Sequence, residues 1–270
     1  MNKALFFLRL SSIVLLASCV SVPPKVIGDM GMPSMSGQWA SGYFVVAPRE
    51  TVLVVIGVSG RHHSRWDNEI SEAEIEAARE DAARKVAMFH GMKVTVEAFN
   101  QAGASVFDYI MDLQVSLELN TDHTRFIEQL TFDPAQDVFV FQGGTFVRFK
   151  YAASVPSVNR AGTADSNGRP AWIDSRNLPK VEGHTLAVGF SQNQAQLKDT
   201  IMKSAEATAA RLITSTTTSI ATSVDDVVGQ GSMTYIHNKS EGNLTGFRVL
   251  EFWIDPANMS VYTLGIARSN

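Results

Sequence analysis

The one pair of adjacent histidines, His62-His63, is the first place where the sequence offers metal chemistry, because imidazole is a common zinc ligand. Carboxylates follow at Asp67, Glu69 and Glu72. Adjacent residues of a strand point to opposite faces, so the pair suits a single metal ion poorly. We interpret the segment as a polar loop before a helix, and we predict no metal site and no cofactor. The other four histidines are isolated in the sequence: His90, His123, His184 and His237.

Two Gly-x-Ser sequences, ending at Ser59 and Ser191, could indicate a nucleophilic serine. Both lack the second glycine of the Gly-x-Ser-x-Gly turn that exposes the serine of hydrolases. Residues 57–60 also lack the Lys-Ser/Thr pair of a phosphate-binding loop and the three glycines of a dinucleotide-binding turn. We therefore expect no catalytic residue and predict that the protein is not an enzyme.

Cys19, the only cysteine, is placed for covalent lipid attachment. It follows the three parts of a secretory signal peptide, namely two basic residues, an apolar core over 10–16 and the small residues Ala17 and Ser18. The apolar core is too short to span a membrane. We predict that residues 1–18 are a signal peptide, and a single cysteine leaves no internal disulfide.

The sequence Leu16-Ala17-Ser18-Cys19 resembles the lipobox of bacterial lipoproteins. The resemblance implies cleavage before Cys19 and acylation of its thiol and its new amino terminus with chains such as palmitate. Two or more acyl chains give stable membrane anchoring, whereas one does not. Val20, rather than Asp, follows the cysteine, which by the same resemblance favours the outer membrane, with the protein facing the periplasm.

The composition of the 270 residues is that of a globular protein, 45% hydrophobic and 19% charged. The formal net charge of −4 implies no broad basic surface, so we expect no nucleic-acid partner. Residues 19–50 and 153–168 are rich in Pro, Gly and Ser without periodicity, and we predict that they are a flexible tether and a linker.

The two remaining ranges, 51–152 and 169–270, carry similar patterns. Each begins with an apolar segment, at 53–59 or 185–191, and continues into an alanine-rich stretch. Apolar residues there recur at steps of three, four and four, which is typical of a helix with one apolar face. They are Ile75, Ala78, Ala82 and Val86 in the first range, and Met202, Ala205, Ala209 and Ile213 in the second. We predict an α+β fold of two similar units, each with one Ala-rich helix packed on a mainly antiparallel β-sheet.

Helix starts and hairpins are predicted at matching places in the two ranges. Ser71…Glu74 and Ser191…Gln194 both fit a capping box. An Asp-Pro turn signal, at 133–134 and at 255–256, has strand-like residues on both sides and predicts a β-hairpin. Alternating apolar residues predict further strands at 92–98, 115–119, 232–237 and 247–254.

The second range resembles a bacterial family. It opens with Pro170-Ala171-Trp172-Ile173, continues with an Ala-Val-Gly strand and an Ala/Arg-rich helix, and closes with a Trp-x-Asp…Tyr-x-Leu hairpin at 253–264. These motifs are similar to those of the outer-membrane lipoprotein family typified by a twenty-kilodalton membrane-associated lipoprotein, over residues 169–270 and more weakly over 51–152. The resemblance implies lipid anchoring and no enzymatic activity, and relatives include flagellar basal-disc lipoproteins that form rings.

Aromatic residues alternate near the end of the first range, at Phe139, Phe141, Phe146, Phe149 and Tyr151. Either they pack in a core, or they form an exposed edge that binds a partner.

We predict a non-enzymatic scaffold or interaction lipoprotein of the cell envelope, which self-associates or belongs to an envelope or flagellar-associated assembly. The alternative is a module that binds a small ligand, peptidoglycan or a metal in the cleft between the two units. A polar cleft lined by His62, His63 or His184 would favour that alternative.

Overall fold

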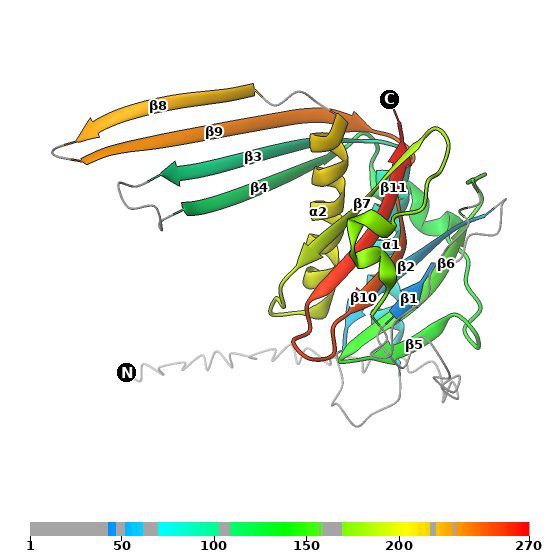
Figure 1. The fold of residues 1–270 in the computed structure, drawn as a ribbon. Helices are drawn as coiled ribbons and strands as arrows, with labels where there is room; N and C mark the ends of the chain where they lie inside the picture. Colours follow the sequence, from blue (N-terminus) through cyan, green and yellow to red (C-terminus); the bar gives the residue numbers. More distant parts are fainter. Residues whose placement is uncertain are drawn as a thin grey trace, which may run out of the picture.

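The computed structural model describes residues 43–46, 52–61, 70–102, 109–156, 158, 169–216, 220–228 and 231–269. Within these ranges the chain has a mixed α+β fold with three antiparallel sheets (Figure 1). The predicted fold class is therefore confirmed at this level. No helix in the described ranges is long and apolar enough to cross a membrane.

The first sheet carries helix α1 (Glu72–His90) on one face. Its strands are β2 (Leu53–Gly60), β6 (Gly144–Tyr151) and β5 (Val138–Phe141), in the order β2-β6-β5. The four predicted stripe residues of α1 are all buried, while Glu80 on the opposite side is exposed. The predicted apolar face of this helix is therefore confirmed.

The second sheet carries helix α2 (Leu197–Thr216) in the same way. Its strands are β1 (Tyr43–Val45), β10 (Arg248–Ile254), β11 (Val261–Arg268) and β7 (His184–Ser191), in that spatial order. Ala205, Ala209 and Ile213 of the predicted stripe are buried, whereas Met202 is half-buried. Strand β1 lies inside the range 19–50 that we interpret as a tether, so the end of that range belongs to the sheet.

The third sheet is built from one hairpin of each half of the chain. Its strands are β4 (Tyr109–Leu119), β3 (Met92–Ala102), β9 (Gly231–Leu244) and β8 (Ile220–Val228), in the order β4-β3-β9-β8. Figure 1 shows these four strands reaching out together from the body of the protein. The strands predicted at 92–98, 115–119 and 232–237 are thus confirmed, but they join in a shared sheet.

Three short 3-10 helices complete the described structure. They are η2 (His123–Gln129), η3 (Ala171–Ile173) and η4 (Ser175–Asn177). η2 packs beside α1, and η3 contacts β11.

The two predicted capping boxes have different outcomes. At α1, the Ser71 hydroxyl accepts from the Glu74 amide at 3.2 Å and the Glu74 carboxylate accepts from the Ser71 amide at 2.9 Å, as predicted. The box at Ser191…Gln194 is wrong, because Ser191 still pairs with Val261 in the sheet and α2 begins only at Leu197. The Ser191 hydroxyl donates to the Gln192 carbonyl instead.

The two predicted Asp-Pro hairpins also differ. The turn at 255–256 does connect β10 to β11. In the first half the hairpin turn is at Gln142-Gly143, whose positive φ values of 48° and 79° suit a tight type I′ turn. The hairpin predicted around 133–134 is therefore wrong, because the segment before it enters η2 and makes only an isolated bridge from Thr131 to Lys150.

The first and second sheets share one core. Phe44 of β1 stacks on Phe252 of β10, with ring centroids 4.5 Å apart, and on Phe146 of β6 at 5.0 Å. Of the alternating aromatic residues, Phe139, Phe146, Phe149 and Tyr151 are buried and Phe141 is half-buried. These residues pack in the core, so an exposed aromatic edge at 139–151 is excluded.

Candidate functional site

The structure leaves the strongest predicted site residue outside its described ranges. Cys19, the signal peptide and most of the predicted tether lie there, together with His62, His63, Asp67 and Glu69. Glu72 is described, and it is an exposed residue in the first turn of α1. Within the described ranges, no three His, Cys, Asp or Glu side chains come together as a group that could hold a metal ion.

The isolated histidines lie in separate places. The His90 Nε2 atom is 2.9 Å from the Tyr151 hydroxyl, and the ring stacks on Phe126. Burial lowers the pKa of His90 below its ordinary value, with a smaller contribution from the Arg125 charge. His184 contacts the Glu182 carbonyl, and His123 lies beside Glu80. His237 lies on strand β9 and pairs with Phe99 of β3.

Among the described residues, no base is placed beside either Gly-x-Ser serine. Ser59 is buried in β2 opposite Thr145 of β6, and neither hydroxyl has a hydrogen-bond partner among the described residues. Ser191 ends β7 and donates to a neighbouring backbone carbonyl.

Side chains of both helices bind the outer edges of the strands beneath them. β2 is an edge strand of the first sheet, and its Val58 amide donates to Asp81 of α1 at 2.8 Å. Lys85 donates both to the Ile56 carbonyl at 2.6 Å and to Asp81 at 2.7 Å. β7 is an edge of the second sheet, and its Val188 carbonyl accepts from Arg211 of α2 at 2.6 Å.

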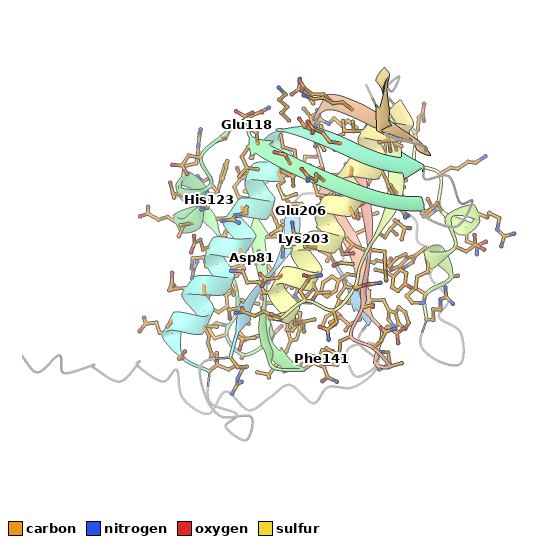
Figure 2. All side chains as sticks on the ribbon, turned by 90° about the vertical axis from the view of Figure 1, so that its left-hand side faces the viewer. Asp81, Glu118, His123, Phe141, Lys203 and Glu206 are labelled. Atoms are coloured by element: carbon orange, nitrogen blue, oxygen red, sulfur yellow. The ribbon has the colours of Figure 1, made fainter. Side chains whose placement is uncertain are left out.

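These contacts occupy outward backbone groups at Ile56 and Val58 of β2 and at Val188 of β7. A free strand edge exposes amide and carbonyl groups that can pair with another chain. Figure 2 shows Asp81 between the two helices, where its carboxylate is almost completely buried. The other edges of these two sheets are β1 and β5, which have only three and four residues. Short edges offer little backbone to a partner.

The third sheet has long edges instead. Within the described ranges, the eleven-residue β4 pairs only with β3, and the nine-residue β8 pairs only with β9. Figure 2 shows Glu118 near the end of β4 where this sheet joins the body. These two outer strands are the part of the described structure best suited to binding another protein chain.

The two faces of the third sheet have different chemistry near the body. One face is apolar, where Met92, Val94 and Val96 of β3 pack with Leu212 and Ile213 of α2. On the same face, the residues of β4 are only half-buried: Val115, Leu117 and Leu119.

The opposite face of the third sheet carries exposed ion pairs. Lys93 lies 2.8 Å from Glu241, and Lys239 lies 3.8 Å from Glu97. The hydrogen bond and charge of Glu241 raise the pKa of Lys93, and the hydrogen bond from Lys93 lowers the pKa of Glu241.

A pocket lies between the two halves of the body. Its lining is mainly apolar, with contributions from Ile56, Met88, Ile201 and Phe252, together with Lys85, Arg248 and other residues. Lys85 is already bonded to Asp81 and to a backbone carbonyl. His184 does not line this pocket.

Buried side chains fasten the opening motif of the second half and the predicted linker to the second sheet. Trp172 is buried, and its indole N–H donates to the buried carboxylate of Glu251 on β10 at 2.6 Å. Arg248 of the same strand donates to the Pro156 carbonyl at 2.9 Å, so the segment between the halves is fastened to the second sheet.

Comparison of the chain with family models, with curated proteins and with solved structures finds no match.

Proposed function

We propose that the protein is a non-enzymatic, lipid-anchored lipoprotein of the cell envelope that acts as a scaffold and self-associates. The observation that carries this proposal is the third sheet, which reaches out from the body and ends in two long strands with unpaired outer edges in the described ranges. The lipobox at Cys19 supports the anchoring, and the resemblance to lipoproteins supports an outer-membrane location and an envelope or flagellar-associated assembly.

Internal duplication is part of this proposal. The order strand, helix, hairpin, hairpin occurs twice, and the corresponding strands follow the orders β2-β6-β5 and β7-β11-β10. Gly57 and Gly189 occupy matching strand positions under the helices. A Cβ atom at Gly57 would lie 1.9 Å from the Ala78 carbonyl oxygen, and one at Gly189 would lie 2.1 Å from that of Ser204. The same close approach in both halves supports two copies of one unit, over 51–152 and 169–270.

The alternative is a module that binds a small ligand, peptidoglycan or a metal between the two units. The pocket there is mainly apolar, and its Lys85 already has two partners. This lining lacks His184 and is not the polar cleft that would favour the alternative, so the scaffold is the better supported proposal.

The anchoring is tested by labelling cells that express the full chain with radioactive palmitate. We expect label on the wild-type protein and none on Cys19→Ser, because stable anchoring depends on the acyl chains. The self-association is tested by measuring the mass of the detergent-extracted wild-type protein at micromolar concentration. Label that persists on Cys19→Ser would contradict the anchoring, and a monomer would contradict the self-association.

A further inference from the structure

We infer that copies of this chain join by sheet continuation, in which β8 of one copy pairs with β4 of the next. This inference rests on the proposed self-association and identifies the surface that makes it. The contact joins two different edges, so each copy can engage two neighbours and the copies can form a ring or a chain.

The strand directions fit this contact. β3 and β8 both lead outward from the body, and β4 and β9 both return to it (Figure 1). β8 of one copy beside β4 of another, with both bodies on the same side, is therefore an antiparallel pair. It repeats the geometry of the β3–β9 contact, which already joins the two hairpins within one copy.

The two edges overlap along part of their length. The strand pairing places Ile220 of β8 on the same cross-strand row as Lys239 of β9, Glu97 of β3 and Gln114 of β4. Asp225 and Tyr109 share another row. Residues 220–225 of one copy can therefore face residues 114–109 of the next without a shift along the strands. In that register Asp112 is on the row of Thr222 and Asp225 is on the row of Tyr109, so over residues 220–225 no acidic residue lies opposite another.

The apolar face of β4 favours a second copy as the partner. Val115, Leu117 and Leu119 are only half-buried although they lie next to the fully buried residues of β3. α2 ends at Thr216 and β8 begins at Ile220, so a neighbour that pairs through β8 brings the end of its own α2 close to β4. In its own copy the same helix covers β3 through Leu212 and Ile213, which are buried there.

The other strand edges are occupied or short, which supports the same contact. Helix side chains occupy β2 and β7, and β1 and β5 are short. Within the described ranges, β4 and β8 are the two longest strands that pair with a single neighbour.

Disulfide cross-linking of the full-length protein in membranes tests the contact. Asp112→Cys is combined in turn with Ile220→Cys, Thr222→Cys and Val224→Cys, so that a register shift of two residues in either direction is still detected. Within one copy, positions 112 and 222 are separated by β9 and β3, about 14 Å at the usual strand spacing. A disulfide needs Cα atoms within about 7 Å, so the bond can form only between copies.

We expect mild oxidation of at least one double variant to give a ladder of dimers, trimers and larger species that collapses under reducing agent. Each single variant should give no more than dimers. The pair Asp112→Cys with Glu80→Cys, an exposed position on α1, is the matched control and should give no ladder. The parent chain with Cys19 alone controls for the native thiol.

The possible outcomes test the proposed β4–β8 contact and the proposed function separately. A wild-type protein that assembles, with no ladder from any of the three pairs, overturns the sheet continuation and leaves the proposed scaffold intact. A wild-type monomer without a ladder overturns both. A ladder from one β4–β8 pair and none from the control supports the contact.

Discussion

The edge strands β2 and β7 of the body differ from the edge strands β4 and β8 of the third sheet in whether helix side chains bond their outward backbone groups. β2 and β7 have amide or carbonyl groups bonded by Asp81, Lys85 and Arg211, side chains of the helices that cover them. β4 and β8 are long and have no second strand in the described ranges. Proteins usually protect long strand edges, because unprotected edges associate. The difference therefore indicates which edges are kept for the protein's own fold and which are available to a partner.

The largest expected effect comes from breaking a protected edge. Asp81→Leu removes the acceptor of the Val58 amide and leaves Lys85 nearly buried without its carboxylate. Loss of one member of a buried ion pair typically lowers the free energy of unfolding by about 3 kcal/mol or more. Urea unfolding followed by circular dichroism measures this, and Glu80→Leu, at the neighbouring exposed position, is the control. Equal midpoints for the two variants would show that the Asp81 contacts do not hold the edge.

A smaller loss of stability is expected when a larger side chain is placed between α1 or α2 and its sheet. Ala82 and Ala209 are completely buried against the strands, so Ala82→Leu and Ala209→Leu overfill the contact. Such overpacking costs about 1–3 kcal/mol. The same urea experiment applies, again with Glu80→Leu as the control. A midpoint as high as that of the control would mean that the helix–sheet contact has room for a larger side chain.

Removing the helix side chain that bonds β7 should lower the free energy of unfolding less than removing the one that bonds β2. Arg211→Ala removes one hydrogen bond to the Val188 carbonyl from a side chain that is partly exposed. One hydrogen bond contributes about 1 kcal/mol to stability. A loss as large as that of Asp81→Leu would show that β7 depends on its helix cation as strongly as β2 depends on the buried pair.

The smallest effect belongs to the polar face of the projecting sheet. Lys93 and Glu241 are both exposed and screened by water, so Lys93→Gln should not measurably change the urea midpoint. It should also leave the mass of the assembly unchanged, because the proposed contact uses the strand edges. A lower mass for Lys93→Gln would move the contact from the edges to this face.

Local features of the sequence predicted local features of the fold. The steps of three and four identified the buried face of α1, and the Ser71…Glu74 box defined its start. At α2 the same signal failed, because pairing between Ser191 and Val261 extends the strand past the expected cap. Pairing between distant strands is decided by the whole fold, and no short window contains it.

The pairing that forms the third sheet, where the candidate site lies, was likewise not predictable from local sequence. Alternation predicted strands near 92–98 and 232–237, yet their pairing across more than a hundred residues of chain was not predicted. Strand β1 was missed because three residues carry no period, although Phe44 lies at the centre of the aromatic core. The apolar residues at 111, 113, 115, 117 and 119, which alternate with polar ones, are the signal that could have extended the predicted strand beyond 115–119. Cys19, the one site residue predicted, stays a prediction.

The mass of the full-length, detergent-extracted protein tests the role of the open edges most directly. Val115 lies on the apolar face of β4 and is half-buried, whereas its neighbour Ser116 lies on the other face, is exposed and falls outside the residues 109–114 proposed to pair with β8. A charged side chain on the inward, apolar face of an edge strand disfavours association with another chain. We predict a multiple of the chain mass for wild type and for Ser116→Lys, and a monomer with unchanged circular dichroism for Val115→Lys. A monomeric wild type, or a folded Val115→Lys that assembles like wild type, would contradict the account.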